Sequence, residues 1–347
     1  MLELHTFRYR PLKRVLAAIA LLLSALAISL PASANPDTWK RQGWAKTDFA
    51  KSSIDFAEIK SGGPPKDGIP SIDKPVFTTA DKANDLADRE PVIGLEINGD
   101  ARAYPLRILT WHEIVNDTVG GKPVTVTYCP LCNAAIVFDR VVDGRTLDFG
   151  TTGKLRKSDL VMYDRQTESW WQQFTGEAII GAMLGKSLAI LPSRLESFAE
   201  FKARHPQGRV LIPNDPNMRA YGHNPYFEYD SAKRPFLYSG PFPEGIPPMA
   251  RVVVVRGKAG ASAISLAHVR KSSPLLIDGH RISWAPGQAS ALDQRDIAKG
   301  RDVGTVRVTR DGADGKALDA AYDVTFAFVF HAFHPDRKIV TGDTPPQ

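Results

Sequence analysis

The 347-residue sequence contains only two cysteines, and this scarcity limits the classes of protein to which it can belong. A small disulfide-rich scaffold is excluded, because such a fold needs several cysteine pairs. The chain also lacks a strong excess of one charge, since 44 basic residues face 38 acidic ones. No G-x-S-x-G, Walker A, G-x-G-x-x-G or H-E-x-x-H pattern occurs, so we expect no nucleotide cofactor.

Long apolar runs are also scarce, and the one that occurs lies at the N-terminus. Basic residues at 8–14 precede an uncharged apolar segment at 15–30, and small residues follow at 32 and 34. This order is typical of a secretory signal peptide over residues 1–34, with cleavage after Ala34. An uncleaved N-terminal membrane anchor is the alternative. We therefore expect a periplasmic or secreted protein.

The charge of the remaining chain argues against binding to nucleic acid. Residues 1–34 carry four basic residues and one acidic residue, so their removal lowers the net charge from +6 to +3. A charge of this size does not predict a nucleic-acid partner. No later apolar run is long enough to span a bilayer. A protein partner in the cell envelope is compatible with the sequence, which does not identify it.

Hydrophobic patterning predicts an α+β fold in which strands predominate. Alternating apolar residues flank Asn98-Gly99, a dipeptide suited to a type I′ hairpin turn, and residues 124–128 are rich in β-branched side chains. A short helix or turn is expected over 105–115. Residues 159–171 predict a turn between two strands with buried tryptophans, in preference to a pocket lined by residues 162–165.

The middle of the chain predicts a helix and an irregular arm. Ser193 and Glu196 have the spacing of a capping box and favour a helix over 193–205. Eight prolines between 213 and 248 oppose regular structure. The aromatic residues of that segment favour an arm packed over the core.

Internal similarity predicts a duplication. Residues 92–106 match 252–266 at a constant offset of 160, and offsets of 156 to 159 continue the match. The expected organisation is a signal peptide at 1–34, an extended lead-in at 35–87, a first β-rich unit at 88–185, a helix and proline-rich arm at 186–247, and a second β-rich unit at 248–347. Only the first unit carries cysteines.

The C-x-x-C motif of Cys129 and Cys132 carries the clearest chemistry. Two thiols at this spacing can chelate a metal, act as a redox pair or form a structural disulfide. A thioredoxin-type site places a helix after the motif, whereas the residues at 134–140 predict a strand. A strand, a C-P-x-C turn and a second strand are typical of a metal knuckle, and Asn133 tolerates the positive φ of such a turn.

A closed metal site usually has about four ligands, and histidines are the candidates for the remaining two. His112 lies 17 residues before Cys129, and His331 and His334 lie near the end of the second unit. Strand alternation would place His331 and His334 on opposite faces, and His334 is favoured because it ends the expected strand. The predicted ligands of a zinc or copper ion are Cys129, Cys132, His112 and His334.

Four motifs carry a resemblance to a known family. They are H-E-I-V-N-D at 112–117, Y-C-P-L-C at 128–132, S-D-L-x-M-Y-D-R-x-T at 158–167 and Y-G-x-N-P-Y-x-x-Y-D at 221–230. In these runs the chain resembles the bacterial and archaeal domain of unknown function 3179 family. Members commonly have glycine where this chain has Asn133. The resemblance covers most of residues 85–340, implies one folded unit and names no activity.

Three functions are compatible with these patterns. The first is an exported protein that binds a transition metal through the C-x-x-C knuckle and histidine. The second is a periplasmic thiol–disulfide redox protein that uses Cys129 and Cys132. The third is a disulfide-clipped scaffold that recognises a partner through the aromatic arm at 221–242.

Overall fold

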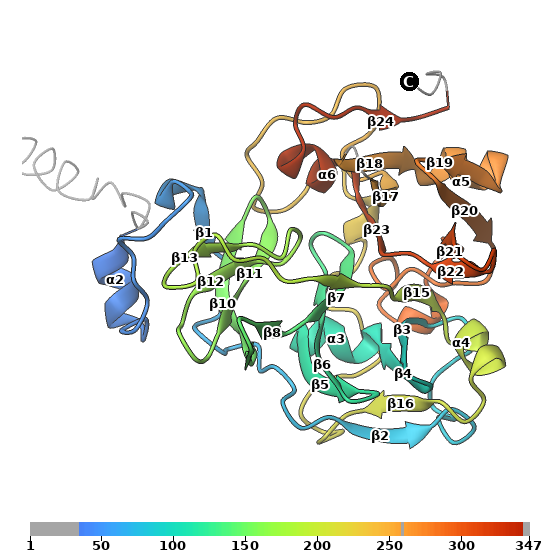
Figure 1. Ribbon diagram of the computed structural model, residues 1–347, viewed down its shortest axis with the longest axis horizontal. Helices are drawn as coiled ribbons and strands as arrows, with labels where there is room; N and C mark the ends of the chain where they lie inside the picture. The colour runs from blue at the N-terminus through green and yellow to red at the C-terminus, as the bar shows by residue number, and fades with distance from the viewer. Residues whose placement is uncertain (1–34, 258–259, 343–347) are drawn as a thin grey trace, which may run out of the picture.

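The computed structural model of the protein describes residues 35–257 and 260–342 (Figure 1). Strands make up 40% of the chain and helices 14%, which confirms an α+β fold of predominantly β structure. Within the described residues no helix has the length and apolarity needed to cross a membrane. The predicted signal peptide lies outside these residues.

The first half of the chain builds a five-stranded sheet around the predicted hairpin. Asn98 and Gly99 both have positive φ, 51° and 79°, as the type I′ turn requires. Helix α3 follows the hairpin directly, within the predicted 105–115 segment. The sheet order is β15-β3-β4-β16-β2. The bounds are β2 Val76–Thr79, β3 Pro91–Ile97, β4 Asp100–Pro105, α3 Leu106–His112, β15 Arg194–Ser197, α4 Phe198–Arg204 and β16 Arg209–Ile212.

The second half builds a sheet of the same plan. Its order is β23-β17-β18-β24, and helix α5 follows the hairpin as α3 does. In the first sheet β15 is antiparallel to β3 and β16 is parallel to β4. In the second sheet β23 is antiparallel to β17 and β24 is parallel to β18. The bounds are β17 Arg251–Gly257, β18 Gly260–Ser265, α5 Leu266–Ser272, β23 Tyr322–Phe326, α6 Ala327–Phe333 and β24 Ile339–Val340.

Corresponding elements of the two halves keep constant spacings. The unit β3-β4-α3 begins and ends 160 residues before β17-β18-α5, and helix α4 lies 129 residues before α6. The second spacing coincides with a repeated F-x-A-x-H-P sequence at 201–206 and 330–335, whose offset of 129 differs from the offsets of 156 to 160 in the other matching segments. The repeated plan is a property of the fold, and its origin by duplication stays a prediction.

Two of the local predictions were wrong for the same reason. Ser193 and Glu196 do not form a capping box, because residues 194–197 pair as β15 with β3. Helix α4 begins later, with Ser197 as its N-cap accepting the Glu200 N–H. The expected strand around His331 is helix α6, because the residues before it pair as β23 with β17. In both places long-range pairing decides where the helix begins.

Each half also contains a second antiparallel sheet. Strands β6 and β20 end at Cys129 and Ala285, which lie 156 residues apart, one of the offsets of the internal similarity. A four-residue turn follows Cys129, whereas residues 286–304 with the 3-10 helix η3 follow Ala285. The orders are β14-β7-β6-β5 and β19-β20-β21-β22. The bounds are β5 Ile114–Val119, β6 Lys122–Cys129, β7 Ala134–Asp139, β14 Ile190–Leu191, β19 Leu275–Ile277, β20 His280–Ala285, η3 Ile297–Lys299, β21 Thr305–Asp311 and β22 Ala317–Asp319.

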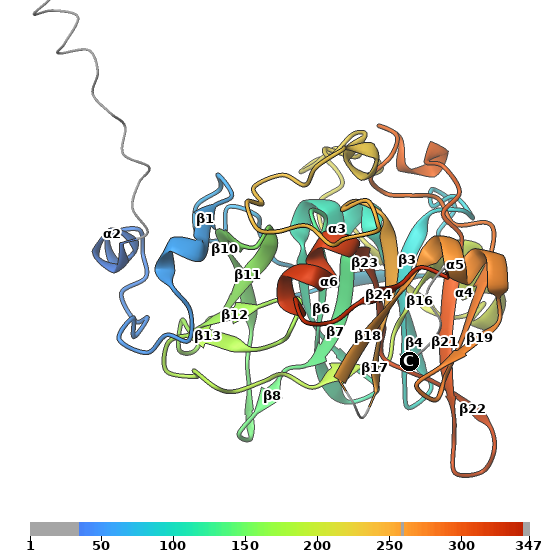
Figure 2. The same cartoon turned by 90° about the horizontal axis from the view of Figure 1, so that it is seen from above.

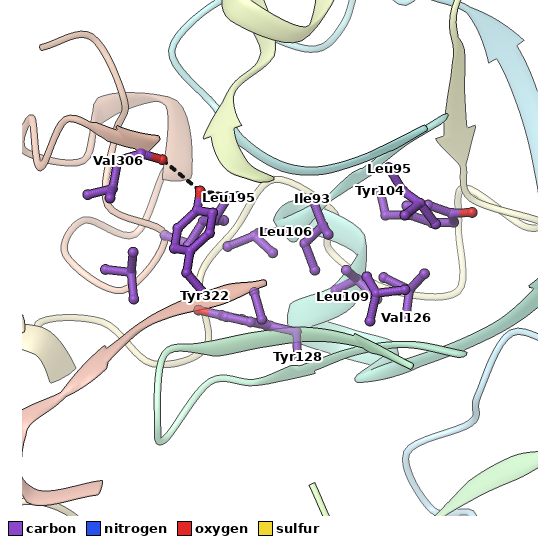
Figure 3. Packing of buried hydrophobic residues seen from close by; sticks show 14 of the residues in the cluster. Ile93, Leu95, Tyr104, Leu106, Leu109, Val126, Tyr128, Leu195, Val306 and Tyr322 are labelled. Carbon is purple, nitrogen blue, oxygen red and sulfur yellow. Dashed lines mark hydrogen bonds between the residues drawn. The ribbon is translucent and has the colours of Figure 1, made fainter. Parts of the chain in front are cut away.

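One hydrophobic core joins the two halves. Tyr128 of the first half and Tyr322 of the second point into the same cluster, together with residues of α3 (Figure 3). The Tyr322 hydroxyl donates to the Val306 carbonyl at 2.6 Å and accepts the Leu195 N–H at 3.2 Å. Because Leu195 belongs to β15, these bonds tie the first sheet to the second half. Burial of such large side chains is the main stabilising term of the fold.

A further sheet occurs in the first half alone among the described residues. Its order is β1-β10-β11-β12-β13, and its outer side packs against the lead-in, where Trp39 and Trp44 each lie 5.0 Å from Trp170 between ring centroids. The lead-in is therefore partly structured. The bounds are α2 Pro36–Arg41, η1 Phe56–Glu58, β1 Ile59–Ser61, β8 Val141–Val142, β9 Arg145–Thr146, β10 Phe149–Arg156, β11 Asp159–Asp164, β12 Trp170–Gln172 and β13 Ala178–Ile180.

The proline-rich arm, residues 213–250, crosses the surface with one short 3-10 helix, η2 (Tyr229–Ser231). Figure 2 shows it lying next to α3 and α6. Its anchor is the buried Asp230, which Arg251 contacts at 3.0 Å and Arg301 at 2.9 Å. Tyr226, Tyr229 and Tyr238 pack against the core. The prediction of an irregular, packed arm is confirmed.

Candidate functional site

The C-x-x-C motif forms the turn between β6 and β7. Cys129 ends β6 and pairs with Ala134, the first residue of β7. The Cys132 N–H donates to the Cys129 carbonyl and the Asn133 N–H to the Pro130 carbonyl, both at 3.2 Å. Asn133 has the expected positive φ of 51°. A strand follows the motif, so no helix dipole lowers the pKa of the thiols.

The second half of the chain closes this turn from outside. The Cys132 carbonyl accepts the Phe326 N–H at 3.2 Å and the Thr325 hydroxyl at 2.7 Å. The Asn133 amide donates to the Val324 carbonyl at 2.7 Å. Strand β23 therefore holds the cysteine-bearing turn in position.

The turn brings both thiols to a carboxyl group of the extra sheet. The sulfur atoms of Cys129 and Cys132 and a carboxylate oxygen of Asp159 lie within 4.8 Å of one another. All three residues are buried, and both cysteines are free thiols. Across 35–257 and 260–342 this is the one group of three or more potential His, Cys, Asp or Glu ligands so close together. We call it the thiol–carboxylate cluster.

Asp159 owes its position to the hairpin of β10 and β11. The hairpin turn at Lys157 and Ser158 has positive φ at both residues, 55° and 67°, and Asp159 follows as the first residue of β11. One carboxylate oxygen, Oδ2, accepts the Gln172 side-chain amide at 2.6 Å and the Phe174 N–H at 2.9 Å. The other, Oδ1, is buried and accepts no N–H or hydroxyl group of the described residues. Burial raises the pKa of Asp159 to about 6, while hydrogen bonding from the two thiols acts to lower it.

The two thiols share a polar neighbour and an apolar environment. The Ser158 carbonyl oxygen lies 3.5 Å from the Cys132 sulfur and 4.0 Å from the Cys129 sulfur. Burial raises the pKa of both thiols, and the proximity of the two sulfurs raises that of Cys132 further. Both sulfurs are therefore protonated at neutral pH in the metal-free protein. A reactive thiolate has the opposite environment, exposed and electropositive.

A second buried carboxyl group belongs to Glu113, which follows α3 with a positive φ of 60°. Its carbonyl accepts the Tyr128 N–H at 2.8 Å, so Glu113 lies beside the strand that ends at Cys129. Burial, with the charge of Asp159, raises the pKa of Glu113 to about 8. Within the described residues no hydrogen bond to the Glu113 carboxyl group contributes to this shift. Glu113 therefore lies near the thiol–carboxylate cluster and its charge acts on Cys129, but it is not one of the three closely spaced groups.

The comparison with known proteins matches this region as a whole. A family described as "Protein of unknown function (DUF3179)" matches residues 66–337, which include both thiols, both carboxyl groups and the arm. The chain belongs to the DUF3179 family. No curated protein and no solved structure matches it. The resemblance seen in the four sequence motifs is therefore confirmed.

In this DUF3179 protein His112 lies outside the thiol–carboxylate cluster. Its Nδ1 is 2.7 Å from the Pro70 carbonyl and its Nε2 is 2.7 Å from the Tyr221 hydroxyl. Both ring nitrogens are thus engaged, and the ring stacks on Tyr221. His112 attaches the lead-in and the start of the arm to α3, while its neighbour Glu113 is the residue near the thiols.

His334 also lies outside the cluster. It caps the C-terminal end of α6, with its ring centroid 5.0 Å from that of Phe330 and 6.3 Å from that of Phe174. Burial and the nearby Arg256 lower its pKa. The preference for His334 over His331 relied on strand alternation, and that argument is wrong because the segment is helical.

Asp159 of the DUF3179 cluster and the neighbouring Glu113 were missed at the sequence level, although both lie in the family motifs. Asp159 is the second residue of S-D-L, and Glu113 follows His112 in H-E-I-V-N-D. The prediction of structural roles for residues 162–165 fits the contacts of Asp164, which accepts the Trp171 indole N–H at 2.9 Å. The sequence did not show that Asp159, at the start of a strand, is buried, and this burial is what distinguishes it from a surface carboxylate.

The arm covers the DUF3179 cluster from the solvent side. The Tyr229 hydroxyl donates to the Leu131 carbonyl, inside the C-x-x-C motif, at 3.0 Å. The Ser158 hydroxyl donates to the Phe236 carbonyl of the arm at 2.6 Å. These two bonds attach the arm to both sides of the cluster, which explains how both sulfurs stay buried.

Proposed function

We propose that this DUF3179 protein is an exported protein that binds a divalent transition metal through the thiolates of Cys129 and Cys132 and the carboxylate of Asp159. The observation that carries the proposal is the approach of these three ligand atoms to within 4.8 Å in a buried region. Thiolate sulfur and carboxylate oxygen are both established ligands of zinc in proteins. Asp159 takes the place that the sequence had given to His112 and His334.

The electrostatics of the cluster support a bound cation. Burial raises the pKa of both thiols and of Asp159, and no basic side chain of the described residues hydrogen-bonds to these groups. Buried anions without a counter-charge are costly, so the metal-free groups keep their protons. A metal ion supplies the missing charge and releases those protons.

Charge balance and geometry favour zinc within this proposal. Two thiolates and one carboxylate carry a charge of −3, so Zn²⁺ leaves a smaller excess of negative charge in this apolar environment than Cu⁺ does. A carboxylate oxygen of Asp159 is the third ligand atom. The buried carboxyl group of Glu113, whose charge acts on Cys129, is the candidate for a fourth, which a closed zinc site requires.

Metal analysis of the purified protein tests the proposal. After loading with Zn²⁺ and gel filtration, we expect about one zinc per chain in the wild type, since the proposed set forms a single site. We expect essentially none in Cys129→Ser/Cys132→Ser, and an affinity at least about tenfold weaker in Asp159→Asn. Asp164→Asn is the matched control, because Asp164 is a buried carboxylate at the other end of the same strand. Equal, substoichiometric zinc in the wild type and the double serine variant would sink the proposal.

Export is tested separately by the N-terminus of the protein recovered from the cell envelope. The signal peptide predicted at 1–34 places Asn35 first in the mature chain. Intact-mass measurement distinguishes this species from a chain that retains residues 1–34.

A thiol–disulfide redox pair is the second candidate, and the position of Asp159 beside both thiols favours it. Oxidation of the two thiols to a disulfide would send two electrons and two protons to a disulfide of a partner protein, with Asp159 relaying a proton. The raised pKa values and burial of the sulfurs oppose this role, because exchange needs an accessible thiolate. A disulfide reversibly formed at a potential well above about −300 mV, in a protein that takes up no zinc, would favour it. The disulfide-clipped scaffold stays a prediction.

A further inference from the structure

A pocket of about 450 Å³ lies next to the hairpin turn that contains Lys157. Lys157 lines the pocket, and the carbonyl of the next residue, Ser158, contacts both sulfur atoms. The remaining walls come from three segments far apart in the sequence, at 57–60, 237–241 and 331–335. The volume lies within the range of small-molecule sites.

The pocket combines an apolar wall with a few polar groups. The apolar part comes from the arm and from the end of α6, and it includes Leu237, Tyr238 and Pro335. The acidic and basic side chains of the lining are Glu58, Lys60, Lys157 and His331. A mainly apolar lining with a small number of placed polar groups is the usual composition of a ligand site.

The charges around the pocket do not cancel. Its one acidic residue, Glu58, is paired with Arg156 at 2.9 Å. The Lys157 ammonium donates to the Ala332 carbonyl at 2.7 Å, a neutral group. Within the described residues neither Lys157 nor Lys60 forms a salt bridge, and at Lys157 the charge of Arg156 outweighs that of Glu58. Two ammonium groups therefore lack a counter-ion at this pocket.

The backbone of the pocket wall is held in unusual conformations. Leu237 has a φ of 52° and Lys157 a φ of 55°, a region that bulky side chains rarely adopt. The hydrogen bond from Ser158 to the Phe236 carbonyl and the one from the Phe236 N–H to Tyr229 hold this part of the arm. Strained backbone fixed by surrounding contacts is concentrated at ligand sites.

We infer that this pocket binds a small organic anion, whose apolar body lies against Leu237 and Tyr238 and whose carboxylate is held by Lys60 and Lys157. The uncompensated ammonium groups select the negative charge, and the apolar wall selects a carbon skeleton over a bare inorganic ion. The site shares no side chain with the thiol–carboxylate cluster. It therefore stands whether or not the cluster binds a metal.

Titration of the purified full chain with 4-fluorobenzoate, followed by ¹⁹F NMR, tests this inference. We expect saturable binding, and binding at least about tenfold weaker for 4-fluorobenzyl alcohol, which has the same ring without the charge. Lys157→Met should weaken the binding of 4-fluorobenzoate about tenfold, and Lys60→Met about threefold because Lys60 is exposed. Lys186→Met, which alters a lysine outside the pocket, should leave it unchanged.

Two further points keep the test decisive. Lys157→Met also removes the hydrogen bond to Ala332, so thermal unfolding must show that this variant is folded, and Lys60→Met tests the same prediction independently. Equal affinity for the acid and the alcohol would overturn the inference. So would undiminished binding of 4-fluorobenzoate in the folded Lys60→Met/Lys157→Met double variant.

Discussion

The two halves of the chain share one plan of strands and helices, but only the first half carries the thiol–carboxylate cluster. Strand β6 ends at Cys129 and a tight turn, whereas its counterpart β20 ends at Ala285 and the long segment 286–304. The first half also has the extra sheet that supplies Asp159. The shared arrangement of strands and helices is therefore a framework, and the thiol–carboxylate cluster depends on the tight turn and the extra sheet that the first half has in addition.

The residue after the first helix shows the same contrast on a smaller scale. Glu113 follows α3 and Ser273 follows α5, 160 residues later. Glu113 has a φ of 60° and a buried carboxyl group, whereas Ser273 has a φ of −61° and its hydroxyl accepts the Trp284 N–H at 2.9 Å. The same position of the shared plan thus holds a hydrogen-bonded structural serine, Ser273, in the second half and a buried acidic residue, Glu113, in the first.

The largest effect on stability is expected from Glu113→Gln in the metal-free protein. The pKa of Glu113 is raised from 4.5 to about 8 in the folded protein, so ionisation of this carboxyl group opposes folding. The protonated group contributes fully to the free energy of unfolding below about pH 4.5, and this contribution is lost as the pH rises to about 8. Above pH 8 the variant should be more stable than the wild type by about 4–5 kcal/mol. Urea unfolding with a chelator at pH 5 and pH 8.5 measures this difference. An identical pH dependence in both proteins would show that the pKa of Glu113 is not raised by burial beside the cluster.

A smaller loss is expected when the turn of the first half is given a β-branched residue. Asn133→Val must adopt a φ near 51° and loses the hydrogen bond to the Val324 carbonyl, which together cost about 2–4 kcal/mol. Asn133→Gly accepts the same φ and loses only the hydrogen bond, about 1 kcal/mol. Thermal unfolding of both variants separates the two contributions. Equal losses would show that the positive φ is not what selects Asn133.

The smallest effect is expected from copying the cysteines into the second half. Ala285→Cys/Gln288→Cys places the motif at the matching positions, but Ala285 is exposed while Gln288 is buried, and the nearby carboxylate of Asp302 already accepts the Gly287 N–H. The zinc content should stay at the wild-type value, which inductively coupled plasma mass spectrometry measures. A second bound zinc would show that the C-x-x-C motif is sufficient without the extra sheet.

Features set by neighbouring residues were predictable from the sequence. The turn at Asn98-Gly99, helix α3, the strand after Cys132 and the positive φ of Asn133 all follow from local conformational preferences. The resemblance to the DUF3179 family was likewise readable, because its four motifs are contiguous runs. Local preference and motif spacing therefore fixed the framework around the cysteines.

Features set by long-range pairing were not predictable in this way. Ser193 and Glu196 imitate a helix start, but β15 is drawn into the sheet by β3, about 100 residues earlier. The approach of Asp159 to Cys129 depends on how the β10–β11 hairpin folds back, and its short sequence neighbourhood does not specify that. The two thiols of the cluster were therefore recognised from the sequence, whereas Asp159 and the neighbouring Glu113 were not.

The hydrogen bonds from Thr325 and Phe326 to the Cys132 carbonyl can form only after most of the chain has been synthesised. A chain that emerges N-terminus first presents its two thiols almost 200 residues before the strand that encloses them. During that interval Cys129 and Cys132 are open to metal ions, oxidants and partner thiols alike. Once β23 docks and the arm is attached, both cysteines are buried. The buried environment of the two thiols is therefore complete only after the second half of the chain has been made.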